Sequence, residues 1–231
     1  SIRDDRDAAT QWLIANGAVA GRRQWRDAIS TAVERDNHTA FALLNRADWR
    51  PWIDRQFASK LLTDAAQNAD ARLVQTMLQF GANPDGVTEA QYIPPPLFQA
   101  ANGVGEGPND HSATDRQLVV RTLLSAGASI EFCPDGFIDY CESPLFLVKD
   151  PFIATMLIDA GADVNFKNSE GDHIFFNIST ESVALVLIAR GADLTAVRTG
   201  DGMTLRRWAA YNRWPRVMVL IDRAQQRQPQ R

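Results

Sequence analysis

Three histidines, His38, His111 and His173, are the residues of this sequence best suited to general acid–base chemistry or metal binding. Catalysis requires such groups to converge on one substrate. These histidines fall in three different copies of an internal repeat, described below, and stacked repeats do not bring distant copies together. We therefore expect each histidine to be structural or solvated rather than catalytic.

Two short segments resemble ligand-binding loops but lack residues that the chemistry requires. GVGEG (103–107) has the glycines of a phosphate loop, but no Lys-Ser/Thr pair follows it and no strand is expected before it. DVNFKNSEGD (163–172) resembles a calcium loop, but Lys167 occupies a ligand position and Asn168 stands where glycine is required. No cysteine pair has zinc-site spacing with further ligands. We predict no catalytic residue, no metal site and no cofactor, and therefore a protein that is not an enzyme.

The two cysteines, Cys133 and Cys141, flank a Pro-Asp-Gly turn in FCPDGFIDYC. Two extended segments folding back on this turn could bring the sulfur atoms within bonding range. Free thiols in a cytoplasmic protein are the preferred interpretation. A disulfide would instead indicate an oxidising compartment such as the periplasm, and the sequence leaves this choice open.

The overall charge gives no reason to expect nucleic acid or a membrane surface as the partner. The chain has 231 residues, 45% of them hydrophobic, and a net charge of −4. No apolar run approaches the roughly 18 residues of a membrane span. The first residues, SIRDDRDAAT, lack the apolar core of a signal peptide, although the start at Ser1 leaves open whether a leader was removed.

The charge is distributed unevenly along the chain. Residues 80–185 contain fifteen acidic and four basic residues, a net charge of −11, whereas the rest of the chain has a net charge of +7. Within the acidic part, the segment 128–143, ASIEFCPDGFIDYCES, combines four carboxylates with three aromatic rings. Aromatic side chains anchor protein interfaces and charges steer association, which favours a protein-binding role for this segment.

The alternative is that these carboxylates only keep the protein soluble while the rings pack on a neighbouring loop. The predicted partner-binding residues come from this segment and from two later turns. They are Glu131, Phe132, Asp135, Phe137, Asp139, Tyr140, Glu142, Glu170, Asp172 and Asp201.

All six tryptophans lie outside the acidic part of the chain. We expect them in terminal repeats that seal the open core, because the ends of a repeat array must be covered. The alternative is a second contact surface at Trp49 and Trp52, in ADWRPWIDR. The tryptophans are Trp12, Trp25, Trp49, Trp52, Trp208 and Trp214.

An internal repeat organises the sequence. MLIDAGADVN (156–165), LLSAGASIE (123–131), LIARGADLT (187–195) and MLQFGANPD (77–85) share one pattern of apolar residues followed by Gly-Ala. The successive markers are separated by 30, 34, 46, 34, 30 and 33 residues, close to a 33-residue period except at one step. They are Gly17, Ala47, Gly81, Gly127, Gly161, Gly191 and Ala224, with alanine in the glycine position twice.

The residue types within the repeat predict its local structure. The apolar run is typical of a short helix covered on most sides, and the glycine suits the left-handed position that ends it. The turns SEGD (169–172) and TGDG (199–202) then form the tip of an extended finger. Prolines suit the first position of the following helices, where the missing N–H is not needed. They are Pro96, Pro144, Pro151 and Pro215.

The sequence resembles the ankyrin repeat family, whose repeat runs Gly-x-Thr-Pro-Leu-His-x-Ala-Ala and ends its second helix with Leu-Leu-x-x-Gly-Ala-Asp-x-Asn. DAGADVN (159–165) matches the end of that second helix, and GMTLRRWAA (202–210) keeps the Gly, Thr and Ala-Ala but lacks the Pro and His. PPLFQAANG (95–103) keeps Pro, Leu and Ala-Ala, with Phe98 in the His position. The resemblance covers residues 5–225 and is stronger from residue 73 onward.

Departures from the family pattern mark places where this chain is specialised. From Pro144 to Met156, and again from Ile174 to Val186, the first helix and its turn are about three residues short. The 46-residue step contains a polar insertion, NGVGEGPNDHSATDR (102–116). We expect it to project between the two helices of one repeat, opposite the finger tips. A hydrolase or transferase site hidden in this insertion is a weaker alternative, because the required residues are missing.

The resemblance implies an all-α ankyrin-repeat solenoid of about six helix-turn-helix repeats with short β-hairpin fingers. We expect one domain over residues 1–224, with weak repeats in 1–72 and clear repeats in 73–224, and a disordered tail over 225–231.

The resemblance also implies binding of another protein on the concave face formed by fingers and inner helices. We expect an inhibitor or immunity-type protein that neutralises a bacterial effector or enzyme, because we expect a short stand-alone solenoid with an acidic face and loops enlarged for one partner. Only three of the 24 basic residues are lysine, which favours a GC-rich bacterial genome. The alternative is a non-catalytic scaffold or adaptor. The partner should present a basic surface, and the protein alone should be monomeric.

Overall fold

The structure, a computed structural model, describes residues 22–35, 52–87, 94–102, 113–131 and 143–227. In these ranges the chain is helical and contains no β-strand, so the described part of the fold is all-α. Two of the helices are single 3-10 turns, labelled η. The elements are α2 (Arg22–Arg35), α4 (Arg55–Gln67), α5 (Ala71–Gln79), α6 (Pro96–Asn102), α7 (Ala113–Ser125), η3 (Pro144–Phe146), α8 (Pro151–Asp159), η4 (Ile174–Phe176), α9 (Glu181–Ala189), α10 (Leu205–Tyr211) and α11 (Pro215–Arg227).

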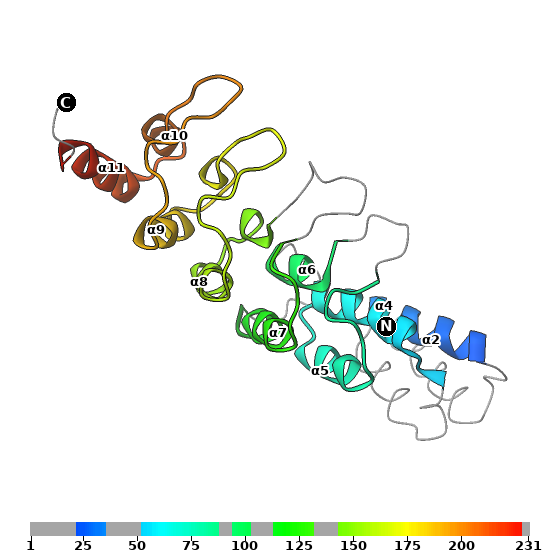
Figure 1. The fold of residues 1–231 in the computed structure, drawn as a ribbon. Coiled ribbons are helices and arrows are strands. Elements are labelled where there is room, and N and C mark those ends of the chain that lie inside the picture. The colour runs from blue at the N-terminus through cyan, green and yellow to red at the C-terminus, as the bar shows by residue number, and fades with distance from the viewer. Residues whose placement is uncertain (1–21, 36–51, 88–93, 103–112, 132–142, 228–231) are drawn as a thin grey trace, which may run out of the picture.

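The helices lie in two rows that run the length of an elongated molecule (Figure 1). The inner row contains α2, α4, α6, η3, η4 and α10, and the outer row contains α5, α7, α8, α9 and α11. Along the rows, α4 contacts α2 and α6, and α9 contacts α8 and α11. Across the rows, α4 contacts α5, α6 contacts α7 and α10 contacts α11. Neighbouring elements therefore provide most of the packing.

The core lies between the two rows. Near the start of successive inner-row elements, Leu97, Leu145, Ile174 and Leu205 are all at most 2% exposed. Outer-row residues such as Leu157 meet them and are fully buried. Burial of side chains of this size contributes about 1.5–3 kcal/mol each, which is what holds helices of only seven to nine residues in place. Within the described residues, no helix is both long and apolar enough to cross a membrane.

The predicted helix starts are confirmed at the prolines. α6, α8 and α11 begin at Pro96, Pro151 and Pro215, and the turn η3 begins at Pro144. Side chains just before several elements accept the free N–H groups of the first turn: Ser143 caps η3 and Asp150 caps α8.

The glycine positions are confirmed as well. Gly81, Gly127, Gly161 and Gly191 have φ values of +80°, +85°, +111° and +88°, in the left-handed region that favours glycine. The place of Ala224 in the repeat series predicts that it ends a helix. This prediction is wrong, because Ala224 lies inside α11. The same helix continues to Arg227, so residues 225–227 of the expected disordered tail are helical.

The predicted β-hairpin fingers are not formed as strands in the described residues. The loops that follow α8 and α9 are each closed by one isolated antiparallel bridge, Lys167 to His173 and Val197 to Thr204. These two parts of the chain are closely alike. Residues 151–170 and 181–200 have the same order of helix, turn and bridge and the same pattern of buried and exposed positions, 30 residues apart.

The shortened pattern of two repeats has a structural counterpart. Where α10 has two turns of helix, the equivalent elements η3 and η4 are three-residue 3-10 turns. The polar insertion is shorter than expected, because α7 begins at Ala113 and includes its last four residues. Residues 103–112 of the insertion lie outside the described residues, as do His38, His111, Cys133 and Cys141.

Candidate functional site

Four of the ten predicted partner-binding residues lie in the described part of the chain. They are Glu131, Glu170, Asp172 and Asp201. Glu131 is exposed at the end of the segment that follows α7. The other six, Phe132, Asp135, Phe137, Asp139, Tyr140 and Glu142, lie outside the described residues, so the prediction for the 128–143 segment stays a prediction.

Glu170, Asp172 and Asp201 come together at one site. They line an open hollow of about 390 Å³ between the loop after α8 and the loop after α9, which we call the loop hollow. The second loop also contributes Arg198, Thr199 and Gly200 to its wall. The site forms because the two loops stand side by side, one repeat apart (Figure 1).

Asp172 ties the two loops together. Its side chain is only 8% exposed, and Oδ1 accepts the backbone N–H of Thr199 on the other loop at 2.7 Å. Within its own loop, Asn168 Oδ1 accepts the N–H groups of Glu170 and Asp172 at 3.0 and 2.8 Å. The backbone around Glu170 is therefore held by its own hydrogen bonds, while the Glu170 side chain remains exposed.

An ion pair on the second loop forms another part of the wall. Arg198 Nε donates to Asp201 Oδ1 at 3.0 Å, and a second guanidinium nitrogen donates to Asp201 Oδ2. Arg198 and the backbone N–H of Met203 lower the pKa of the Asp201 carboxyl to about 2. Because this pair is neutral as a unit, the net charge of the hollow comes from the carboxylates of Glu170 and Asp172.

Arg198 also connects the hollow to an aromatic pair on α10, the partly buried Trp208 and the exposed Tyr211. Its guanidinium carbon lies 5.5 Å from the centre of the Trp208 ring, and Trp208 stacks on Tyr211 with the centroids 5.8 Å apart at 20°. Tyr211 is 75% exposed. The buried Phe176 meets Trp208 edge-on from η4, at a centroid distance of 6.1 Å, and so braces the pair from beneath.

The sequence prediction missed Arg198 and Tyr211 and gave Trp208 a different role, that of sealing the end of the array. The sealing role fits Trp25 and Trp214 better, which are 0% and 5% exposed. The spacing of the sequence repeat could have identified this site. If the repeats stack, residues about 30 positions apart, such as Glu170 and Gly200, must be neighbours. The aromatic residues of the following helix, the partly buried Trp208 and the exposed Tyr211, complete the site.

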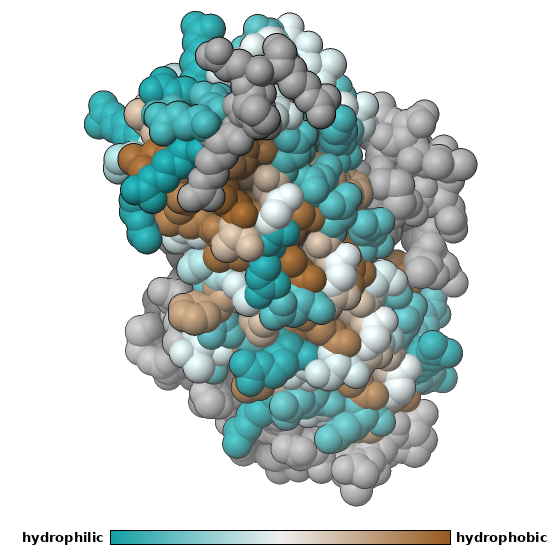
Figure 2. Space-filling model, turned by 60° about the vertical axis from the view of Figure 1, so that its left-hand side comes forward, coloured by the Kyte–Doolittle hydropathy of each residue, from teal (hydrophilic) through white to brown (hydrophobic). Residues whose placement is uncertain are grey.

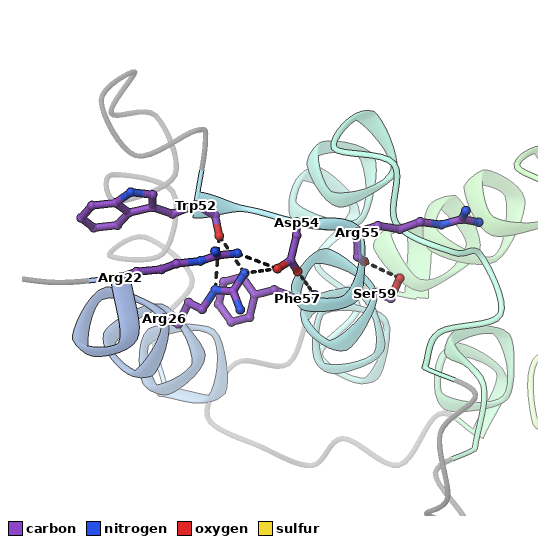
Figure 3. Close-up of polar contacts among 7 residues, drawn as sticks. All are labelled: Arg22, Arg26, Trp52, Asp54, Arg55, Phe57 and Ser59. Atoms are coloured by element: carbon purple, nitrogen blue, oxygen red, sulfur yellow. Dashed lines mark hydrogen bonds and ion pairs between the residues drawn. The ribbon is translucent and has the colours of Figure 1, made fainter.

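A second charged cluster lies at the other end, where α2 meets the start of α4 (Figure 3). Arg22 and Arg26 both donate to Asp54 Oδ2, at 2.7 and 2.5 Å, and Arg26 also donates to the carbonyl oxygen of Trp52. The Arg26 guanidinium carbon lies 4.8 Å above the Phe57 ring. Trp49 lies outside the described residues, so the alternative contact surface at Trp49 and Trp52 is seen only in part.

The outer row carries an apolar groove between α9 and α11. Leu185, Pro215, Val219 and Leu220 line it together with Arg216, around a volume of about 380 Å³. Apolar side chains form a broken band over the face that carries α8, α9 and α11 (Figure 2). Nothing in the described residues shows what covers this groove.

In the described part of the chain, no three His, Cys, Asp or Glu side chains are arranged to hold a metal ion. His173, the one histidine described, is 2% exposed and uses both ring nitrogens in structural contacts. Paired charges next to a partly exposed stack of aromatic rings are typical of a surface that binds another macromolecule.

Neither a protein-family model nor a curated protein matches this sequence. Function therefore has to be inferred from the residues and their geometry.

Proposed function

We propose that this chain is an ankyrin-type repeat solenoid of about six repeats that binds another protein through the edge formed by its loops and inner row. The 30-residue correspondence between 151–170 and 181–200, the repeated left-handed glycines and the two rows of helices support the repeat architecture. Solenoids of this kind bind along an extended surface rather than in a deep pocket.

The observation that carries the proposal is the juxtaposition of the loop hollow with the Trp208–Tyr211 pair. Tryptophan and tyrosine are enriched among binding hot spots, and this stacked pair, with Tyr211 exposed and Trp208 partly buried, is already ordered before the partner arrives. Glu170 and Asp172 beside it favour a partner with a basic contact surface. Residues 80–185, which include Glu170 and Asp172, have a net charge of −11 and would attract the same partner, whereas residues 186–231, which include the aromatic pair, have a net charge of +6.

Among binding roles we favour an inhibitor or immunity-type protein that covers the working surface of a bacterial effector or enzyme. The concentration of acidic charge and aromatic residues on the loops fits recognition of one basic partner. A scaffold or adaptor is the second candidate, and it would use several faces, including the apolar groove between α9 and α11.

The test combines capture of the partner with an assay of its activity. Partners are captured from the source organism with the parent protein and with a double variant, Glu170→Lys with Tyr211→Ala, which should weaken binding by about 2 kcal/mol. Leu118→Ala is the matched control, since Leu118 is 40% exposed on α7 and lines neither the loop hollow nor the apolar groove. A protein retained by the parent and the control but lost from the double variant is the specific partner.

The activity of that partner is then titrated with the parent protein. Loss of activity at one equivalent supports an inhibitor, and unchanged activity supports a scaffold. A second variant, Phe137→Ala with Asp135→Ala and Asp139→Ala, tests the 128–143 segment and should also weaken binding by about 2 kcal/mol. Equal capture by the parent and both variants would contradict the proposed surface.

A further inference from the structure

His173 lies at a junction between two loops and is almost completely buried. It is 2% exposed and immediately precedes η4, where its ring stacks on Phe175 with the centroids 5.8 Å apart. Its Nδ1 lies 3.3 Å from the backbone nitrogen of Phe175, and its Nε2 lies 3.1 Å from Asn165 Oδ1. Both ring nitrogens therefore have a partner inside the protein.

These partners fix the protonation state of the ring. The backbone N–H of Phe175 can only donate, so Nδ1 must accept and carry no proton. Asn165 Oδ1 also accepts the backbone N–H of Asp193 at 2.7 Å, which identifies this atom as the oxygen of the amide. Nε2 must therefore be the donor to Asn165. The arrangement requires the neutral imidazole with its hydrogen on Nε2.

The hydrogen bonds of this group join the loop after α8 to the loop after α9. His173 and Asn165 belong to the first loop and Asp193 to the second. We call the chain of contacts His173–Asn165–Asp193 the loop latch. Together with the bond from Thr199 to Asp172, it holds the two loops in the register that creates the loop hollow.

The surroundings favour the neutral ring. Burial lowers the pKa of His173, and Lys167 acts in the same direction, whereas Asp193 and Asp163 oppose the shift. Among the described residues, the charged groups that act on the ring are Asp163 and Lys167 from its own loop and Asp193 from the next. The two carboxylates do not reverse the effect of burial, since the net shift of the pKa is downward.

Other residues at the equivalent position of this chain do not titrate. Thr204 precedes α10 and accepts the Arg207 N–H through Oγ1 at 3.3 Å, and Ser143 precedes η3 and accepts the Leu145 N–H through Oγ at 3.3 Å. A hydroxyl is therefore sufficient to cap the following turn. Unlike a hydroxyl, the imidazole of His173 also forms a hydrogen bond with Asn165. It can also gain a proton in the pH range where histidine changes charge.

We propose that the loop latch is acid-sensitive: protonation of His173 at Nδ1 opens it and loosens the loop hollow. With a proton on Nδ1, the ring can no longer accept the Phe175 N–H, because both groups are then donors. The hydrogen bond that caps η4 is therefore lost. The charged ring would also have to leave its buried position. Binding at the hollow would then weaken as the pH falls below about 6.5, the ordinary pKa of histidine. This inference goes beyond the proposed function, and its test needs no partner.

The direct test compares the parent with His173→Thr, the residue that the chain itself uses at position 204. A group whose pKa is lower in the folded protein makes the unfolded state bind more protons, so folding stability falls as the pH drops below the unfolded value and levels off below the folded one. We expect the urea midpoint of the parent to fall between pH 7.5 and 5.0 by more than that of His173→Thr. The subtraction removes every pH-dependent contribution that the two proteins share.

Hydrogen exchange localises the effect. The Asp193 amide, which donates to Asn165, should exchange faster on acidification after correction for the intrinsic rate. A single proton raises the opening equilibrium by at most about tenfold per pH unit. In His173→Thr the corrected exchange rate should not change over this range. The control site is the amide of Leu73 in α5, which donates to the side chain of Asp70 just before that helix.

Nitrogen NMR of the parent protein tests the proposal even if the variant does not fold. The expected spectrum at pH 7.5 has the hydrogen of His173 on Nε2, with a titration midpoint below 6.5. A hydrogen on Nδ1, or a midpoint at or above 6.5, would overturn the proposal. Equal pH dependence of the urea midpoint in the parent and His173→Thr would overturn it as well.

Discussion

At the scale of single residues, glycine at the helix ends is required by backbone conformation rather than by space. Gly161 has φ of +111°, and a Cβ built there would meet only Ile130 Cδ1, at an ordinary 3.7 Å. We expect Gly161→Val to lower the free energy of unfolding by about 1 kcal/mol or more, because a β-branched residue is strained in this conformation. Urea melts measure the change.

Gly200 provides the matched control. It lies outside the left-handed region, and nothing lies within 4 Å of a Cβ at that position. Gly200→Val should therefore change the midpoint by much less than Gly161→Val. If both substitutions have the same small effect, the strain argument for Gly161 is wrong.

The sequence predicts residues whose role is local better than residues whose role depends on a distant neighbour. The prolines at 96, 151 and 215 and the glycines at 81, 127, 161 and 191 act on their own backbone, and their predicted positions are confirmed. His173 was expected to be structural or solvated, and it is structural. Its link to Asp193 depends on the contact between two loops, which the residues around His173 do not reveal.

At the scale of elements, Asp54 connects two helices. It caps α4 by accepting the Phe57 N–H at 2.9 Å and binds Arg22 and Arg26 of α2 (Figure 3). The Phe57 N–H and then the Arg26 side chain are the main causes of its lowered pKa. The contribution of the charge is therefore present at neutral pH and is lost as the pH falls below 3.8 through the lowered pKa.

We expect Asp54→Ala to lower the free energy of unfolding by about 1–2 kcal/mol, the usual cost of losing a helix cap. Asp54→Asn separates the two roles, because asparagine keeps the cap but not the charge. Since the Asp54 side chain is 44% exposed, the ion pairs should contribute little, and Asn should be much closer to the parent than Ala. Thermal melts at low and high salt measure both. An Asn variant as unstable as Ala would show that the ion pairs dominate.

The lengths of the inner-row elements and the hydrogen bonds of the loops explain why the predictions of helices and β-hairpin fingers were only partly correct. The shortened sequences before α8 and α9 leave room for only one 3-10 turn each, in η3 and η4, whereas α10 forms two turns of helix. In the loops, side chains such as Asn168, Asp172 and Asp193 satisfy the backbone N–H groups. A single bridge is then sufficient, and an extended ladder of strand hydrogen bonds does not form.

At the scale of the whole molecule, each helix in the two rows packs mainly against its neighbours. α11 contacts α9 and α10, and α4 contacts α2, α5 and α6, but these two groups lie at opposite ends (Figure 1). In such an array the stability is close to a sum of local and nearest-neighbour contributions. Damage at one end should therefore open that end without opening the other.

Ile221→Ala and Leu61→Ala form a reciprocal test of this expectation. Both side chains are at most 1% exposed, Ile221 in α11 and Leu61 in α4, and each truncation should cost about 2–5 kcal/mol where it acts. Hydrogen exchange of Ile221→Ala should be faster in α9, α10 and α11 and unchanged in α4 and α5, and Leu61→Ala should give the reverse. Such a result would also mean that loss of binding in an α10 variant such as Tyr211→Ala reports on that surface rather than on unfolding of the distant helices. Equal acceleration across all described helices in both variants would instead show one cooperative unit, and local packing would then not govern the stability of this molecule.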